Sequence, residues 1–198
     1  MSRFPQAAFT LSVAAPAQFP PDSGAEVAFA GRSNAGKSSA LNALCERNAL
    51  ARTSKLPGRT RLLNYFDLGA GRRIVDLPGY GFAKVSDAER RQWVMLIDAL
   101  RGRASLAGLM LIIDSRRGVL EEDLEFVAWA DPSRLPVHVL LAKSDKLKQA
   151  EKSKALRDAK KALSTDVGVH LFSAHGGEGV REAQNALIGM LKEETPVE

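Results

Sequence analysis

One short segment constrains the fold of this 198-residue chain more than any other. Residues 31–39 read GRSNAGKSS and fit the pattern G-x-x-x-x-G-K-[ST], in which backbone N–H groups of a loop converge on phosphate oxygens. The apolar stretch EVAFA at 26–30 precedes this loop and predicts a buried strand, and residues 37–46 follow with helical periodicity. A strand, a glycine-containing loop and a helix in this order predict a phosphate-binding site at the helix N-terminus.

The rest of the chain alternates strand-like apolar runs with helical segments. Further strands are expected at 106–114, at 135–142, at 168–174 and in a hairpin within 61–79 that turns at Gly69-Ala70-Gly71. Further helices are expected at 86–103 (with Ser86 as cap and Glu89 at the capping-box spacing), 119–130, 147–165 and 177–192. This alternation predicts a mostly parallel six-stranded sheet with one antiparallel edge strand and helices on both faces.

Composition predicts one ordinary globular domain. Hydrophobic residues make up 45% of the chain and charged residues 26%. The formal net charge of +5 is compatible with an anionic partner and equally with a merely basic, solvated surface. Cys45 is the only cysteine, so no internal disulfide is possible, and we expect it to pack in a helix.

The first 24 residues are interpreted as a partly extended N-terminal arm, and residues 25–198 as the nucleotide-binding domain. The arm faintly resembles a signal peptide, but proline, glutamine and serine interrupt its short apolar run. No apolar run reaches the ~18 residues that span a bilayer. We therefore expect a cytoplasmic protein that does not bind membranes.

The segment DLPG at 76–79 predicts a phosphate and magnesium sensor. Asp76 ends an apolar strand, where its carboxylate can reach a magnesium-bound water. Gly79 can offer its N–H to a γ-phosphate without side-chain obstruction. In the phosphate loop itself, Lys37 is expected to reach the β- and γ-phosphates and Ser38 to bind magnesium.

Two later segments predict recognition of guanine. LLAKSDK (140–146) places a Lys-x-Asp at a strand end, where Asp145 can accept from guanine N1–H and N2–H while Lys143 covers the base. Adenine lacks both donors and would leave the carboxylate unpaired, at a cost of about 2 kcal/mol. In FSAHGGEG (172–179), the backbone N–H groups of Ser173 and Ala174 are candidates to meet the guanine carbonyl oxygen.

A second magnesium-binding hydroxyl is expected from the loop after the first helix. Thr53 and Thr60 are both candidates, and Thr60 is favoured because it lies just before the next strand. The same loop carries four basic residues, which could contact phosphate, RNA or a protein partner, or could simply be solvated: Arg52, Lys55, Arg59 and Arg61.

From about residue 25 onward, the chain resembles the EngB (YihA/YsxC) family of bacterial GTPases. The resemblance rests on GRSNAGKSSALN, ARTSKLPGRTRLLNYF, DLPGYGFAKV and DSRRG (114–118), together with the Lys-x-Asp and FSA segments. It implies a P-loop GTPase fold, magnesium bound by Ser38 and Thr60, and a role in assembly of the large ribosomal subunit with a link to cell division and septation. Ala142 and Ala174 depart from the family's usual Thr-Lys-x-Asp and Phe-Ser-Ser.

The nucleotide contacts that the motifs and the resemblance together imply fall in five segments. They are Gly31, Arg32, Ser33, Asn34, Ala35, Gly36, Lys37, Ser38, Ser39, Gly58, Arg59, Thr60, Arg61, Leu62, Asp76, Leu77, Pro78, Gly79, Ala142, Lys143, Ser144, Asp145, Phe172, Ser173 and Ala174.

Tyr80 stands where Ras-like GTPases carry the glutamine that orients the attacking water. Tyr80 is expected to pack beneath the following helix rather than to act in catalysis, so the candidate catalytic residues are Lys37, Asn34 and Thr60. Asn34 could bind a potassium ion that supplies positive charge at the phosphates, or it could only stabilise the loop turn.

Two functions remain open from the sequence: a slow, switch-like GTPase, expected to be monomeric, and a regulatory GTP/GDP-binding module with negligible hydrolysis unless a partner activates it. A membrane-trafficking GTPase is disfavoured because the tail LKEETPVE lacks a prenylation cysteine. A P-loop kinase is disfavoured by the Lys-x-Asp and DLPG segments.

Overall fold

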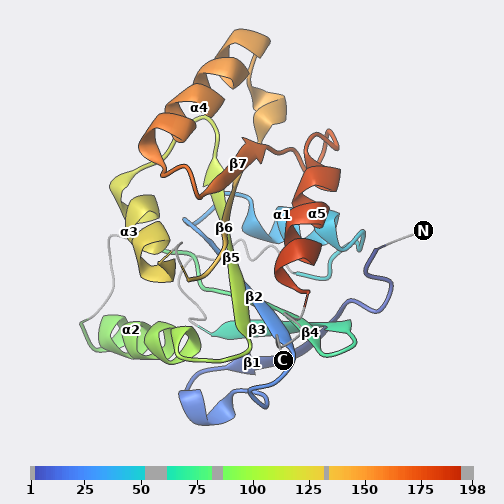
Figure 1. The fold of residues 1–198 in the computed structure, drawn as a ribbon, viewed down its shortest axis with the longest axis vertical. Coiled ribbons are helices and arrows are strands. Elements are labelled where there is room, and N and C mark those ends of the chain that lie inside the picture. The colour runs from blue at the N-terminus through green and yellow to red at the C-terminus, as the bar shows by residue number, and fades with distance from the viewer. Residues whose placement is uncertain (1–2, 52–61, 82–86, 132–133, 193–198) are drawn as a thin grey trace, which may run out of the picture.

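A seven-stranded sheet organises the computed structural model, which describes residues 3–51, 62–81, 87–131 and 134–192 (Figure 1). The strand order is β1-β3-β4-β2-β5-β6-β7. The strands are β1 (Ala8–Val13), β2 (Ala25–Gly31), β3 (Leu63–Gly69), β4 (Arg72–Asp76), β5 (Leu106–Asp114), β6 (Val137–Ala142) and β7 (Gly168–Leu171). The helices are α1 (Lys37–Leu44), α2 (Asp87–Arg101), α3 (Glu121–Ala130), α4 (Gln149–Ala162) and α5 (Val180–Met190), with short 3-10 turns at Pro16–Gln18 and Ser144–Lys146.

The predicted fold class is confirmed, but the predicted strand number was one too low. The additional strand is β1, which the N-terminal arm contributes and which pairs antiparallel with β3. The hairpin of β3 and β4 is antiparallel as predicted, so β3 lies second from the edge rather than at it. The other neighbours, β4 with β2, β2 with β5, β5 with β6 and β6 with β7, are parallel.

Helices cover both faces of the sheet, as the alternating pattern predicts. Helices α1 and α5 pack on one face, where Leu41 and Leu187 join a buried cluster with β2 residues such as Phe29. Helices α2, α3 and α4 pack on the other, where Leu96 and Phe126 belong to a second cluster. Among the described helices none is long and apolar enough to cross a membrane.

The arm is fixed to the sheet by buried polar contacts. Glu26 at the start of β2 is fully buried and accepts from Arg103 and Arg73. Arg103 also donates to the carbonyls of Pro20 and Pro21, and Asp22 accepts from the backbone and hydroxyl of Ser105. These bonds hold residues 20–22 against the end of the sheet opposite to the phosphate loop.

Candidate nucleotide-binding site

The predicted motifs converge at the carboxyl ends of the parallel strands, on one side of the sheet. Gly31 ends β2, Asp76 ends β4, Asp114 ends β5 and Ala142 ends β6. Asp76 pairs with Phe29, Gly31 with Ile112 and Asp114 with Ala142, so neighbouring strands end within two residues of one another. A crevice beyond the carboxyl ends of parallel strands is where α/β proteins bind ligands.

The phosphate loop has a backbone that its sequence makes possible. Gly36 has φ +111°, a left-handed value that favours glycine, immediately before α1 begins at Lys37. A Cβ added at Gly31, the first glycine of the motif, would lie 2.6 Å from the carbonyl oxygen of Ile112. Glycine at this position therefore permits close packing on β5. Asn34 also has a left-handed φ of +61°, a conformation that asparagine tolerates and that is compatible with either of its expected roles.

The sensor segment lies directly against this loop. Lys37 Nζ forms an ion pair with Asp76 Oδ1 and brings Asp76 to the first turn of α1, which also carries Ser38. Burial raises the pKa of Asp76, while Lys37 and the hydrogen bond from Asn64 oppose that rise. A Cβ added to Gly79 would lie 3.2 Å from the backbone nitrogen and Cα of Ser33, so a side chain here would require the phosphate loop to shift by a few tenths of an ångström.

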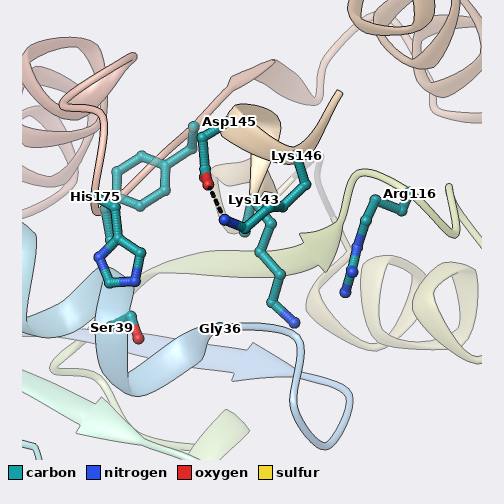
Figure 2. Close-up of a pocket in the computed structure, with 10 residues that line it drawn as sticks. Gly36, Ser39, Arg116, Lys143, Asp145, Lys146 and His175 are labelled. Carbon is teal, nitrogen blue, oxygen red and sulfur yellow. Dashed lines mark ion pairs between the residues drawn. The ribbon is translucent and has the colours of Figure 1, made fainter. Parts of the chain in front are cut away.

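A cavity of about 290 Å³ extends from the phosphate loop to the Lys-x-Asp segment (Figure 2). Its lining comprises Gly36, Ser39, Arg116, Ala142, Lys143, Asp145, Lys146, Phe172, Ala174 and His175. Asp145 accepts from Ser173 Oγ at 2.7 Å and pairs with Lys146 at 3.0 Å. The Ser173 hydroxyl, followed by Lys146, lowers the pKa of Asp145, so the carboxylate is ionised at neutral pH, as an acceptor for guanine must be.

The role expected for Ser173 is revised by its contacts. Its backbone N–H donates to the Glu178 carbonyl at 2.9 Å, while its fully buried hydroxyl orients Asp145. The expected contact of a backbone N–H with the guanine carbonyl oxygen therefore rests on Ala174. His175 is exposed at the rim of the cavity, as expected for a loop residue.

Asp114 and Arg116 are two further candidate residues that the motifs do not identify. Lys143 Nζ donates to Asp114 Oδ2 at 2.9 Å and also to the Asn34 carbonyl, so the base-covering lysine is tied to both β5 and the phosphate loop. Arg116 donates to both Asp114 oxygens, at 2.9 and 2.6 Å. Burial acts to raise the pKa of Asp114, but these hydrogen bonds hold it below its ordinary value. The segment DSRRG, quoted above only for its family resemblance, was the available signal.

Tyr80 packs on α3 and against the buried cluster that also contains Leu96 of α2, the helix that follows it. Its ring stacks on Phe126 with centroids 4.4 Å apart, and its hydroxyl donates to Asp123 Oδ1 at 2.6 Å. The side chain is therefore turned into the core, as expected of a residue that does not orient water. Its partner Asp123 carries no motif signal and was not predicted.

Several predictions fall outside the described residues. These are the cap Ser86, the hydroxyl candidates Thr53 and Thr60, the basic residues Arg52, Lys55, Arg59 and Arg61, and the contact residue Gly58. Leu62 is described and lies half-buried just before β3. Cys45 is fully buried after α1, as expected of a packing residue.

The oxygen donors brought together here fit a magnesium ion better than a softer metal. The Ser38 hydroxyl and the Asp76 carboxylate are the type of ligand that Mg²⁺ takes together with water and phosphate oxygens. The described part of the chain holds no group of three or more His, Cys, Asp or Glu that could bind a metal without such help.

Comparison with known proteins agrees with this geometry. A family model described as "50S ribosome-binding GTPase" matches residues 26–143. The chain is 47% identical over 196 residues to "Probable GTP-binding protein EngB" of Azoarcus sp. (strain BH72), covering 96% of this chain and 94% of that protein. It is 49% identical over 197 residues to the protein of the same name from Dechloromonas aromatica (strain RCB), covering 96% and 90%.

Solved structures support the same fold. A crystal structure of a probable GTP-binding protein engB has a TM-score of 0.67 at 23% identity and covers 84% of this chain and 98% of that chain. The structure of Era with MgGDPNP and a segment of 16S ribosomal RNA has a TM-score of 0.64 at 23% identity, covering 88% and 59%. The predicted phosphate-binding, sensor and guanine-binding segments thus occur together in a chain that belongs to the EngB family of GTP-binding proteins.

Proposed function

We propose that the protein binds GTP and GDP with magnesium and hydrolyses GTP slowly, as a switch in assembly of the large ribosomal subunit. The observation that carries the proposal is the convergence of Lys37, Asp76 and Asp145 around one crevice. Lys37 and Asp76 are in contact, and Asp145 lines the cavity that reaches Gly36 in the same loop. A triphosphate bound along this crevice would place its base against Asp145 and its phosphates on the N-terminus of α1.

The residues of this chain would act mainly by positioning and charge. The loop Gly31–Ser39 would bind the phosphates through backbone N–H groups, and Lys37 would neutralise charge on the β- and γ-phosphates. Ser38, Asp76 through a water, and Thr60 would hold magnesium, which supplies charge stabilisation at the phosphates. An in-line water would attack the γ-phosphate, and Tyr80 would take no part because its hydroxyl is bonded to Asp123.

Slow hydrolysis follows from the absence of a water-orienting amide at residue 80. Single-turnover GTP hydrolysis by the purified protein tests this, with Lys37→Ala expected to lose both binding and turnover. The alternative, a binding module that hydrolyses only with a partner, predicts turnover at the background rate until ribosomal particles are added. Nucleotide competition, in which ATP fails to displace labelled GDP, tests guanine specificity.

Asn34 is proposed as a potassium ligand that compensates for the missing glutamine. A cation next to the phosphates would supply positive charge where the transition state accumulates negative charge. The test compares GTP turnover in potassium and sodium buffers, for the unchanged protein and for Asn34→Asp. Equal rates in both salts, or an Asn34→Asp change without effect, would contradict this role.

The proposed partner is the large ribosomal subunit or its precursor, and charge distribution supports an RNA-rich surface. The segment 142–162, which includes α4, carries eight Lys and Arg but only three Asp and Glu, an excess of five that equals the net charge of the whole chain. Several of these basic side chains are exposed, including Lys148, Arg157, Lys160 and Lys161. Helix α4 lies at one end of the molecule beyond β7, where a large particle could reach it (Figure 1).

Co-sedimentation with ribosomal subunits tests the partner. The unchanged protein is compared under GDP and under a non-hydrolysable GTP analogue across a salt series, and we expect nucleotide-dependent binding that weakens as salt increases. Neutralising Arg157, Lys160 and Lys161 to glutamine should weaken association and flatten the salt dependence. The matched control neutralises three exposed basic residues elsewhere, Arg134, Arg181 and Lys192.

If the protein sediments with no particle in any nucleotide state, the assembly role is lost while the GTPase proposal stands. We further propose that the protein is monomeric and cytoplasmic. The family resemblance implies that its depletion would impair cell division and septation, which we attribute to defective subunits.

A further inference from the structure

Tyr80 is held from both its side chain and its backbone. The hydroxyl donates to Asp123 Oδ1 at 2.6 Å, and the ring stacks on Phe126 of α3 at an interplanar angle of 21°. The Tyr80 carbonyl accepts from the Ser33 N–H at 3.1 Å, which forms a short parallel bridge between the sensor segment and the phosphate loop. One residue therefore links the phosphate loop to α3.

The Asp123 carboxylate, which accepts from the Tyr80 hydroxyl, is itself held in place by further contacts. It is fully buried at the N-terminus of α3, and its Oδ2 accepts from the Leu120 N–H at 2.9 Å. Its Oδ1 lies 3.4 Å from Arg32 Nε, which is also buried and has no hydrogen-bond partner among the described residues. Arg32 belongs to the phosphate loop, so Asp123 faces two residues that flank the phosphates, Arg32 and Tyr80.

The position of Gly79 follows from this arrangement. Gly79 precedes Tyr80 and lies against Ser33 so closely that an added methyl group would be within 3.2 Å of backbone atoms. A backbone N–H binds a γ-phosphate well only if it is already aimed at the site, because ordering it on binding costs free energy. The backbone next to Gly79 is ordered by the Tyr80 contacts, and the hydroxyl bond to Asp123 joins two buried groups.

We infer that Tyr80 and Asp123 are positioning residues that select the triphosphate over the diphosphate, by holding the Gly79 N–H ready for the γ-phosphate. This inference rests on the proposed function, since it concerns the same nucleotide site. GDP has no γ-phosphate, so loss of the Tyr80–Asp123 bond weakens GTP binding and leaves GDP binding nearly unchanged. A residue that only stabilised the fold would affect both nucleotides alike.

The test measures affinities of the full chain, with magnesium, for fluorescent GDP and for a fluorescent non-hydrolysable GTP analogue. Tyr80→Phe removes the hydroxyl and keeps the ring stacked on Phe126. We expect it to weaken the GTP analogue about tenfold, since a hydrogen bond to a charged group is being lost, and to change GDP affinity less than twofold. Asp123→Asn should shift the same ratio, and the double variant should add little to Tyr80→Phe.

The matched control is Tyr65→Phe. Tyr65 is a buried tyrosine of β3 whose hydroxyl has no hydrogen-bond partner in the part of the chain that is described. The Tyr65→Phe variant should therefore leave the ratio of the affinities for the GTP analogue and for GDP unchanged. If the Asp123→Asn variant does not fold, the affinities of the Tyr80→Phe variant alone test the inference.

The inference is overturned if Tyr80→Phe weakens both nucleotides equally, weakens neither, or tightens the GTP analogue. A similar shift in Tyr65→Phe would also overturn it. These outcomes are distinct from failure of the proposed function, in which the unchanged protein would bind neither guanine nucleotide.

Discussion

At the residue scale, Asp145 is oriented and kept ionised by its neighbours, as the proposed contact with guanine requires. Its Oδ1 accepts from a buried serine hydroxyl, and its Oδ2 faces Lys146 at the rim of the cavity. Both contacts favour the ionised form, and the Ser173 bond also restricts the rotation of the side chain. An oriented, ionised acceptor can then receive the two N–H groups that guanine presents on one edge.

Replacing Asp145 by asparagine should reverse this preference. The amide would present N–H donors to guanine donors, and unpaired buried donors cost about 1–3 kcal/mol, which corresponds to roughly fivefold to 150-fold in GDP affinity. Xanthine carries a carbonyl in place of the amino group, so XDP should bind the variant better than GDP. Competition between GDP and XDP measures the change.

The control for this prediction is Asp166→Asn, an exposed aspartate outside the cavity, which should leave both affinities unchanged. An Asp145→Asn variant that still prefers GDP would show that the carboxylate does not read the base.

The Lys-x-Asp pattern that makes Asp145 a candidate is local in the sequence, whereas the partners of that residue are not. Ser173 lies 28 residues away and was assigned a backbone role, and its hydroxyl contact depends on how the loops after β6 and β7 meet. Asp123 was missed for the same reason, since nothing in the sequence around α3 indicates that a tyrosine 43 residues earlier will donate to it.

At the element scale, the short strand β7 is secured by a pair of histidines. His138 on β6 and His170 on β7 lie 2.7 Å apart between Nε2 and Nδ1. His170 Nε2 donates to the Gly179 carbonyl at 3.0 Å, so the neutral ring must accept at Nδ1 from His138 Nε2–H. The pair thus connects β6, β7 and the start of α5.

This pair should make the protein less stable in mild acid. Burial, followed by His170, lowers the pKa of His138 to about 4, and burial also lowers the pKa of His170 against the opposing effects of Gly179 and Glu182. In the unfolded chain the two histidines bind protons near pH 6.5, whereas in the folded protein they bind them only at lower pH. The free energy of unfolding should therefore fall as pH decreases from about 6.5 towards 4. Thermal unfolding across this range measures it.

His138→Gln retains a donor for His170 but does not titrate, so its melting temperature should decrease less on acidification. His175→Gln, at an exposed loop histidine, should follow the unchanged protein. Parallel acid profiles for all three proteins would exclude the histidine pair as the cause.

Elements with strong apolar periodicity were predictable, and β1 was not. Strand β5 is buried along almost its whole length, and its continuous apolar run indicated its bounds, Leu106–Asp114, directly. Most of β1 is exposed, and prolines lie on both sides of it, so its sequence predicts only an extended segment. Its place in the sheet is determined by pairing with β3, which is a tertiary contact.

At the scale of the whole molecule, the N-terminal arm is part of the core. Phe4 is fully buried in the cluster that also contains Leu68 of β3 and residues of α1, whereas Phe9 on β1 is 53% exposed. The arm therefore supplies one edge strand of the sheet and covers part of its apolar face.

Phe4→Ala should lower the free energy of unfolding by about 3 kcal/mol, because it removes a buried aromatic ring and leaves a cavity. Phe9→Ala should cost less than about 1 kcal/mol, since only an edge-to-face contact with Phe66 is lost. Urea unfolding of the two variants measures the difference. Equal losses would mean that the arm does not contribute to the core in solution.

The pairing of β1 with β3 has a consequence for how the chain folds during its synthesis. Thr10 Oγ1 bonds to the carbonyl of Tyr65, 55 residues later, and the phosphate loop and α1 lie between them in the sequence. Strand β1 leaves the ribosome before β3 and must therefore wait for its partner until β3 has been made, and closing so long a loop costs entropy. The nascent chain can order β1 only after its own nucleotide-binding loop has emerged.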